Sequence, residues 1–123
     1  MFGLSHHQRF FLFSQAVDMR KGFDGLSGIV QQQMGKDASS GDVYIFLGKR
    51  LDRMKILVWE SSGFILYYKR LEAGGRHPEL SDCPKVKDQS ISLTYSELSQ
   101  LLEGLEVEVK YRRKRYAKTL EKA

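Results

Sequence analysis

Hydrophobic and polar positions alternate in short blocks along the chain, and the first blocks predict a strand and a helix. The aromatic run Phe10–Phe13 predicts a first strand. A helix is predicted over about Arg20–Gln33, where four apolar residues recur on one helical face. They are Phe23, Leu26, Ile29 and Val30. Asp18 is the expected N-cap, because its carboxylate can accept a hydrogen bond from a backbone N–H of the first turn.

Three strand patterns then follow in close order and predict an antiparallel meander. They span Val43–Leu47, Met54–Glu60 and Phe64–Leu71. The connection over residues 61–63 is a short turn, so the last two strands should form a hairpin. The connection over residues 48–53 is also short, which favours antiparallel neighbours.

The C-terminal third predicts a strand, a helix and a final strand. Residues 90–94 have the pattern of a short strand, and Thr94 with Glu97 forms a capping box that begins a helix over Tyr95–Glu103. Apolar residues alternate with charged ones from Leu105 to Tyr111, as in a strand. The predicted fold is a small single α+β domain over residues 1–109, with an antiparallel β-meander, two packed helices and a basic C-terminal tail over residues 110–123.

The charge of the chain is unevenly distributed. The net charge is +5, but residues 1–109 carry 13 Lys/Arg against 14 Asp/Glu, whereas residues 110–123 carry seven against one. The whole positive excess therefore lies in the tail, and a polyanion would be attracted to that segment rather than to the domain body.

Length and composition limit the class of protein. The 123 residues, 41% hydrophobic and 28% charged, suit one folded domain with its own core. No apolar stretch has the roughly 20 residues that a membrane span requires, so we expect no membrane association. The first residues lack the order of a signal peptide, and the single cysteine, Cys83, permits no internal disulfide. We therefore expect a cytoplasmic protein.

The tail is the first candidate nucleic-acid contact. It holds six cations within nine residues, interleaved with tyrosines: Lys110, Arg112, Arg113, Lys114, Arg115 and Lys118. Lysine and arginine neutralise phosphates, and tyrosine can stack on exposed bases. Two other interpretations stay open, an acidic protein partner and a solvated charge run without function.

The meander carries a second group of cations. Lys49, Arg50, Arg53 and Lys55 cluster near one end of it, and Lys69 and Arg70 could reach that end across the hairpin. This group could hold a phosphate backbone, or it could serve only to prevent edge pairing of the sheet. We interpret the nearby aromatic residues as core rather than as stacking surfaces. They are Trp59, Tyr67 and Tyr68.

The sequence offers no constellation for catalysis, metal binding or a cofactor. His6 and His7 are adjacent, and no Cys-x-x-Cys or His-x-x-x-His pair supports them. Cys83 has no identifiable base, and Asp18 and Asp24 are explained by helix capping and the helix dipole. A phosphate-binding loop of the P-loop type is absent. We therefore expect no enzyme activity, no cofactor, no metal and no small-molecule substrate.

Several segments carry a resemblance that covers most of the chain, from Phe2 to about Arg115. They are Asp18–Leu26, residues 41–46, Lys55–Glu60 with residues 63–64, residues 67–71 and residues 93–104. In them the chain resembles the accessory protein of bacterial insertion sequences of family 66, the second reading frame often labelled TnpB. The resemblance implies a role in transposition beside a larger DDE transposase, and it implies no catalytic residue. The extension over residues 118–123 departs from that pattern.

Two hypotheses follow for the molecular role. The first is a non-enzymatic accessory factor that binds DNA, at element ends or non-specifically, through its basic residues. The alternative is a protein–protein adaptor for the transposase of the element, without direct DNA contact. A small metal-dependent nuclease is a third class, disfavoured by the missing ligand set. Oligomeric state and DNA sequence preference have no signal in the sequence.

Overall fold

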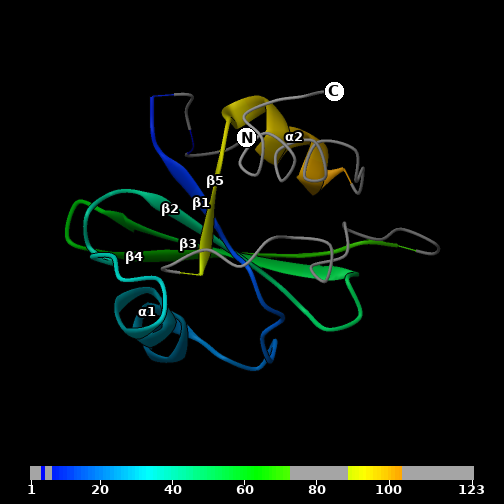
Figure 1. Ribbon diagram of the computed structural model, residues 1–123, viewed down its shortest axis with the longest axis horizontal. Helices are drawn as coiled ribbons and strands as arrows, with labels where there is room; N and C mark the ends of the chain where they lie inside the picture. Colours follow the sequence, from blue (N-terminus) through cyan, green and yellow to red (C-terminus); the bar gives the residue numbers. More distant parts are fainter. Residues whose placement is uncertain (1–3, 5–6, 73–88, 104–123) are drawn as a thin grey trace.

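The computed structural model describes Leu4, residues 7–72 and residues 89–103, and these residues form five strands and two helices (Figure 1). In chain order the elements are β1 (Phe10–Phe13), α1 (Phe23–Gln32), β2 (Val43–Leu47), β3 (Arg53–Glu60), β4 (Gly63–Arg70), β5 (Ser90–Leu93) and α2 (Tyr95–Leu102). The predicted α+β class is confirmed.

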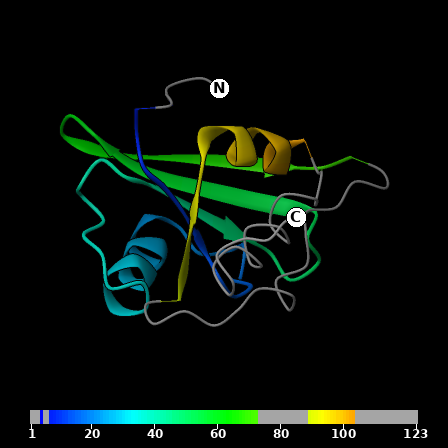
Figure 2. The ribbon, with the colours of Figure 1, turned by 45° about the horizontal axis from the view of Figure 1, so that its top comes forward.

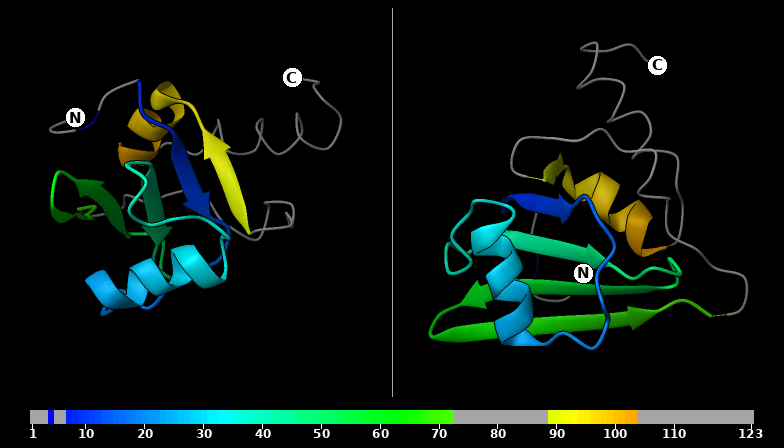
Figure 3. Two further views of the ribbon diagram at one scale, coloured as in Figure 1. Left: turned by 90° about the vertical axis from the view of Figure 1, so that its left-hand side faces the viewer. Right: turned by 60° about the horizontal axis from the view of Figure 1, so that its bottom comes forward.

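The strands form one mixed sheet in the order β4-β3-β2-β1-β5. The predicted meander of β2, β3 and β4 is confirmed as antiparallel, with Ile45 opposite Ile56 and Leu57 opposite Leu66. β1 pairs with β2 in parallel, because the chain crosses over through α1 between them, and β5 lies antiparallel on the other side of β1. The left view in Figure 3 shows β1 between β2 and β5, inside the sheet rather than at its edge.

The two helices cover opposite faces of this sheet, as Figures 1 and 2 show. On one face Leu26 and Val30 of α1 pack with Tyr44 and Leu57. On the other face Leu98 and Leu101 of α2 pack in a second cluster, whose strand residues are Phe10, Leu12, Val43, Ile45, Leu47, Met54, Ile56, Val58, Ile91 and Leu93. Because successive strand residues point to opposite faces, every residue of β2 is buried.

The start of α1 differs from the prediction. The helix begins at Phe23, with Gly22 at the N-cap position and no side-chain capping bond, whereas Arg20 was expected to lie inside it. Asp18 is not the cap, because its carboxylate accepts a hydrogen bond at 2.9 Å from the Arg20 backbone N–H. Aspartate side chains often accept a hydrogen bond from the backbone N–H two residues later. This local turn competes with the capping of a helix that begins farther along the chain.

The start of α2 agrees with the prediction. The Thr94 hydroxyl accepts a hydrogen bond from the Glu97 N–H at 3.1 Å, and the Glu97 carboxylate accepts one from the Thr94 N–H at 2.8 Å. The predicted strand from Leu105 to Tyr111, the basic tail and Cys83 lie outside the described residues. Within the described ranges, neither helix has the length and apolar character needed to span a membrane.

Leu57 provides a test of the two-sided core. Its side chain is fully buried among residues of the α1 face. We predict that Leu57→Ala lowers the free energy of unfolding by about 2–4 kcal/mol, because it removes buried methyl groups and leaves a cavity. Urea unfolding measures this loss, with Ser62→Ala in the exposed hairpin turn as a control that should stay within about 0.5 kcal/mol. An unchanged midpoint for Leu57→Ala would contradict this packing.

Candidate nucleic-acid interface

The loop between β1 and α1 is attached to the end of β2. The Val17 N–H donates to the Leu47 carbonyl at 2.9 Å, and Val17 forms a parallel bridge with Gly48. Gly48 has no side chain where the two segments meet, and a Cβ built there would lie 2.8 Å from the Met19 Cγ atom. A larger residue at 48 would therefore displace the Met19 side chain from its place against this turn.

Lys55 is the second attachment of the same loop. Its side chain is only 8% exposed, on the face of β3 that α1 covers. The ammonium donates to the Lys21 carbonyl at 2.8 Å and lies 4.9 Å from the centroid of the Tyr68 ring. A buried ammonium requires such partners, because it has left water behind. Lys55 is thus a positioning residue and is poorly placed to reach a phosphate.

The turn between β2 and β3 carries two of the predicted cations at its tip. Leu51 has a φ of 65°, uncommon for a residue with a side chain, and is buried in the core on the α2 face. Its N–H donates to the Gly48 carbonyl at 3.0 Å, and this closes the turn. With Leu51 directed inwards, Lys49 and Arg50 are exposed at the tip.

Arg53 and Arg70 stand directly opposite each other where β3 begins and β4 ends. Like charges in this cross-strand position repel each other. The Arg53 Nη1 atom donates to the Tyr68 hydroxyl at 3.4 Å, and its buried Nε has no hydrogen-bond partner among the described residues. The guanidinium of Arg53 therefore keeps donors that the described part of the protein does not use.

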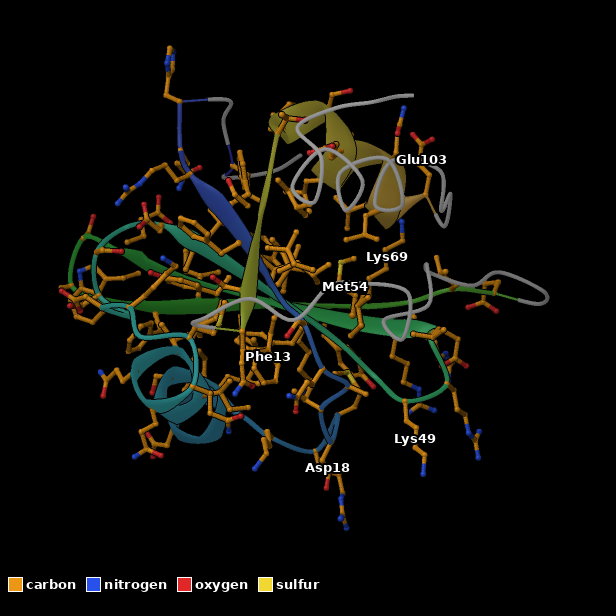
Figure 4. All side chains as sticks on the ribbon, in the orientation of Figure 1. Phe13, Asp18, Lys49, Met54, Lys69 and Glu103 are labelled. Atoms are coloured by element: carbon orange, nitrogen blue, oxygen red, sulfur yellow. The ribbon has the colours of Figure 1, made fainter. Side chains whose placement is uncertain are left out.

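Two clefts meet at Arg53. The first has a volume of about 320 Å³ and is lined by residues 17–19 and 48–50 with Asp52 and Arg53. The second, about 280 Å³, is lined by Arg53, Tyr68 and Arg70. In Figure 4 Asp18 and Lys49 lie on the same side of the sheet, where the first cleft opens.

This end of the sheet is positively charged. We call it the basic end and define it by its six cations: Arg20, Lys21, Lys49, Arg50, Arg53 and Arg70. Two carboxylates lie beside them, Asp18 and Asp52. Asp18 is paired with Arg20, at 2.8 Å between Oδ2 and Nη2. Among residues 7–72 and 89–103, no carboxylate forms an ion pair with the other five cations.

The structure divides the cations that the sequence grouped together. Lys49, Arg50, Arg53 and Arg70 gather at the basic end, and Lys55 is buried beneath it. Lys69, which could reach the same end of the hairpin as Arg70, instead faces the other side of the sheet and donates to the Leu102 carbonyl at the end of α2 (Figure 4). Neighbouring strand residues point to opposite faces, and that signal was already available in the sequence. The tail cations Lys110–Lys118 lie outside the described residues.

Arg20 and Lys21 are additions that the sequence did not single out as contacts. They were assigned to the predicted helix, whereas the structure places them in the loop that borders the first cleft. The Met19 side chain of this loop lies against Gly48, so the loop reaches the β2–β3 turn that carries Lys49. Within the described ranges, no group of three histidine, cysteine, aspartate or glutamate side chains could hold a metal ion.

The chain matches the family model described as IS66 Orf2 like protein, over residues 8–112. It is 36% identical over 106 residues to the uncharacterized protein y4jC of Sinorhizobium fredii (strain NBRC 101917 / NGR234), with 86% of each chain covered. It is 28% identical over 90 residues to the uncharacterized protein y4hO of the same strain, covering 73% of this chain and 74% of that protein. No solved structure matches it.

The match to the family model spans most of the chain, so the protein belongs to the IS66 Orf2-like family. It is therefore an accessory protein of insertion sequences, and its role lies in transposition. The fold and the basic end thus belong to a protein that works alongside the transposition machinery.

The ion pair of Asp18 gives a test of the loop geometry. Hydrogen bonds from the Arg20 guanidinium, and then from the Arg20 backbone N–H, lower the pKa of the Asp18 carboxyl from 3.8 to about 2. We predict that Arg20→Ala raises this pKa towards 3.8 without reaching it, because the backbone bond remains. An NMR titration of the carboxyl carbon measures the shift.

The control for this titration is Lys21→Ala, because Lys21 contributes least to the shift and its removal should leave the pKa near 2. The pKa of Asp18 is lower in the folded state than in the unfolded state. The ion pair therefore stabilises the fold at pH values above the unfolded-state pKa. That contribution is lost as the pH falls through the folded value of about 2. An Asp18 pKa near 3.8 in the parent protein would show that the turn is not formed.

Proposed function

We propose that this accessory protein binds DNA directly during transposition, without catalysing a reaction, and that the basic end of the sheet and the C-terminal tail make the contacts. The binding is electrostatic in the first place. Lysine and arginine side chains neutralise phosphates and release condensed counterions, which gives affinity without sequence preference.

One observation carries the proposal: cations from three separate segments converge on the basic end, and most of them have no acidic partner in the described structure. The loop after β1, the tip of the β2–β3 turn and the end of β4 all contribute. Solvated cations of a typical surface are interspersed with carboxylates. Here Arg53 and Arg70 are placed opposite each other, at a cost in stability that a bound phosphate would remove.

The adaptor role is the second candidate, and the edge of the sheet favours it. β4 has eight residues and pairs only with β3 among the described strands, so its other edge can accept a strand from a partner protein. Under this alternative the transposase of the element should co-purify with the protein after nuclease treatment, and the protein alone should not bind DNA.

The salt dependence of DNA binding tests the basic end. Each neutralised phosphate adds about 0.9 to the slope of log K against log salt. We predict that the double variant Lys49→Ala/Arg50→Ala lowers this slope by up to about two units, and by similar amounts for unrelated duplex sequences. Fluorescence anisotropy of a labelled duplex over a salt series provides the measurement.

The matched control is Arg9→Ala/Lys36→Ala. It removes the same charge at the opposite end of β2, where both cations lie over the Phe11 ring, 5.9 and 4.3 Å from its centroid. Its slope should stay close to that of the parent. Equal slope changes in the two double variants would mean that only net charge matters, and the basic end would lose its role.

The same titration addresses the tail. Replacing Arg112, Arg113, Lys114 and Arg115 with Ala should flatten the slope by up to about four units if all four contact phosphates. A truncation after Val109 that binds with an unchanged slope would remove the tail from the interface. If the parent protein binds no DNA at low salt, the adaptor role replaces the proposal.

The absence of catalysis is also testable. We predict that the purified protein neither cleaves nor joins DNA with Mg²⁺ or Mn²⁺, because such chemistry needs several carboxylates placed together around the metal ions. Gel analysis of labelled element-end DNA is the measurement. Strand cleavage that disappears in Asp18→Asn or Asp24→Asn would overturn this part of the proposal.

A further inference from the structure

We infer that Tyr68 is a stacking platform for a nucleobase, and that the protein therefore binds an unpaired DNA strand more tightly than a duplex. The inference deepens the DNA binding proposed above and rests on it. It concerns the second cleft, which Tyr68 lines together with Arg53 and Arg70.

Tyr68 is one of three exposed residues at the end of β4. The residue is 54% exposed, whereas all ten residues of β2 and β3 from Val43 to Leu47 and from Met54 to Val58 are buried. Among the described residues only Phe23, 47% exposed, is a comparably exposed large hydrophobic side chain. The interpretation of Tyr68 as core is therefore wrong, and an aromatic surface is left open to solvent.

The ring is also held in place from the protein side. The buried Lys55 ammonium lies 4.9 Å from its centroid, and the Arg53 guanidinium donates to its hydroxyl at 3.4 Å. Lys55 is itself fixed by the Lys21 carbonyl at 2.8 Å. A ring held in this way loses little further freedom when a ligand stacks on it, which lowers the entropic cost of binding.

Two arginines line the same cleft as the ring. Arg70 lies on the same face two residues along β4, and Arg53 stands opposite Arg70 on β3. An aromatic ring between cations is the arrangement that binds single strands, because the cations neutralise the backbone while the ring takes a base. An exposed tyrosine on an edge strand does not by itself indicate a binding site. Here two arginines line the same cleft and could contact the phosphates on either side of a stacked base.

The preference for an unpaired strand follows from geometry. In a duplex the flat faces of the bases are covered by their neighbours, and a protein reaches only base edges and phosphates. A ring on a sheet surface can stack only on a base that has left the helix. Transposition supplies such bases wherever strands are opened or cut, so the ligand class is unpaired or locally melted DNA.

The experiment compares Tyr68→Leu with Tyr68→Phe at one salt concentration. Leucine keeps an apolar side chain of similar reach but has no π face, whereas phenylalanine keeps the ring and loses only the hydroxyl. Binding to a labelled thymidine oligomer and to a labelled duplex is measured by anisotropy. We expect Tyr68→Leu to weaken strand binding by roughly 5- to 150-fold, the range of base–aromatic stacking, and to leave duplex binding unchanged.

Tyr68→Phe should bind the strand nearly as well as the parent. A strand that carries 2-aminopurine adds a direct readout, since its fluorescence is quenched on stacking, and Tyr68→Leu should lose this quenching. Circular dichroism and the retained duplex binding show that the variant is folded. The side chain is about half exposed, so the fold should tolerate leucine.

The outcomes separate this inference from the proposed function. Equal losses for strand and duplex in Tyr68→Leu, or quenching that survives it, would overturn the platform and leave electrostatic DNA binding intact. Stronger duplex than strand binding by the parent would do the same. A parent protein that binds neither form refutes the DNA-binding function and the platform together.

Discussion

The buried ammonium of Lys55 is the contact on which the candidate interface depends. It reaches the Lys21 carbonyl on one side and the Tyr68 ring on the other, and so links the loop before α1 to the outermost strand of the sheet. Taking an ammonium out of water is costly unless its partners replace the lost hydration. The loop and the ring are thereby coupled, since the Lys21 carbonyl and the Tyr68 ring contact the same ammonium.

The two helices determine which other residues can serve a ligand. Because α1 and α2 cover opposite faces, the middle of the sheet is buried on both sides, and function is confined to strand ends, turns and the outer strand. The basic end lies at such a position. Gly48 and Met19 bring the loop against the turn there, and the buried Leu51 holds Lys49 and Arg50 outwards. The packing of the core thus places the charges.

Local rules predicted the elements whose cause is local. The capping box of Thr94 and Glu97 acts over four residues, and the short turn before Gly63 allows little but a hairpin. Asp18 was misassigned because one aspartate can satisfy either a turn or a helix end, and the arginine two residues later decides for the turn. The parallel pairing of β1 with β2 depends on a crossover of about thirty residues, which periodicity does not report.

The sequence predicted which types of residue form the candidate site, but not which individual residues lie there. Charge patterning selected Arg53 and Arg70, and strand alternation separates Lys69 from Arg70 without any structure. The burial of Lys55 and the exposure of Tyr68 depend on how the loop before α1 packs on the sheet and on the edge position of β4, which are tertiary features. β3 has apolar residues on both faces, so the sequence does not identify which face of the neighbouring β4 is exposed. The alternation of Tyr67 and Tyr68 therefore does not predict which of the two lies outside the core.

The opposed arginines explain why this end of the sheet differs from an ordinary charged edge. A sheet edge is protected by isolated lysines that repel other strands, and it gains nothing from placing two guanidiniums across from each other. Arg53 also has a buried Nε atom for which residues 7–72 and 89–103 supply no hydrogen-bond partner. The placement of Arg53 and Arg70 therefore lowers the stability of the fold, and a bound anion would offset this loss. Unfavourable arrangements of this kind are found mainly at functional sites. For an accessory protein of an insertion sequence, a DNA phosphate is the anion that transposition brings within reach.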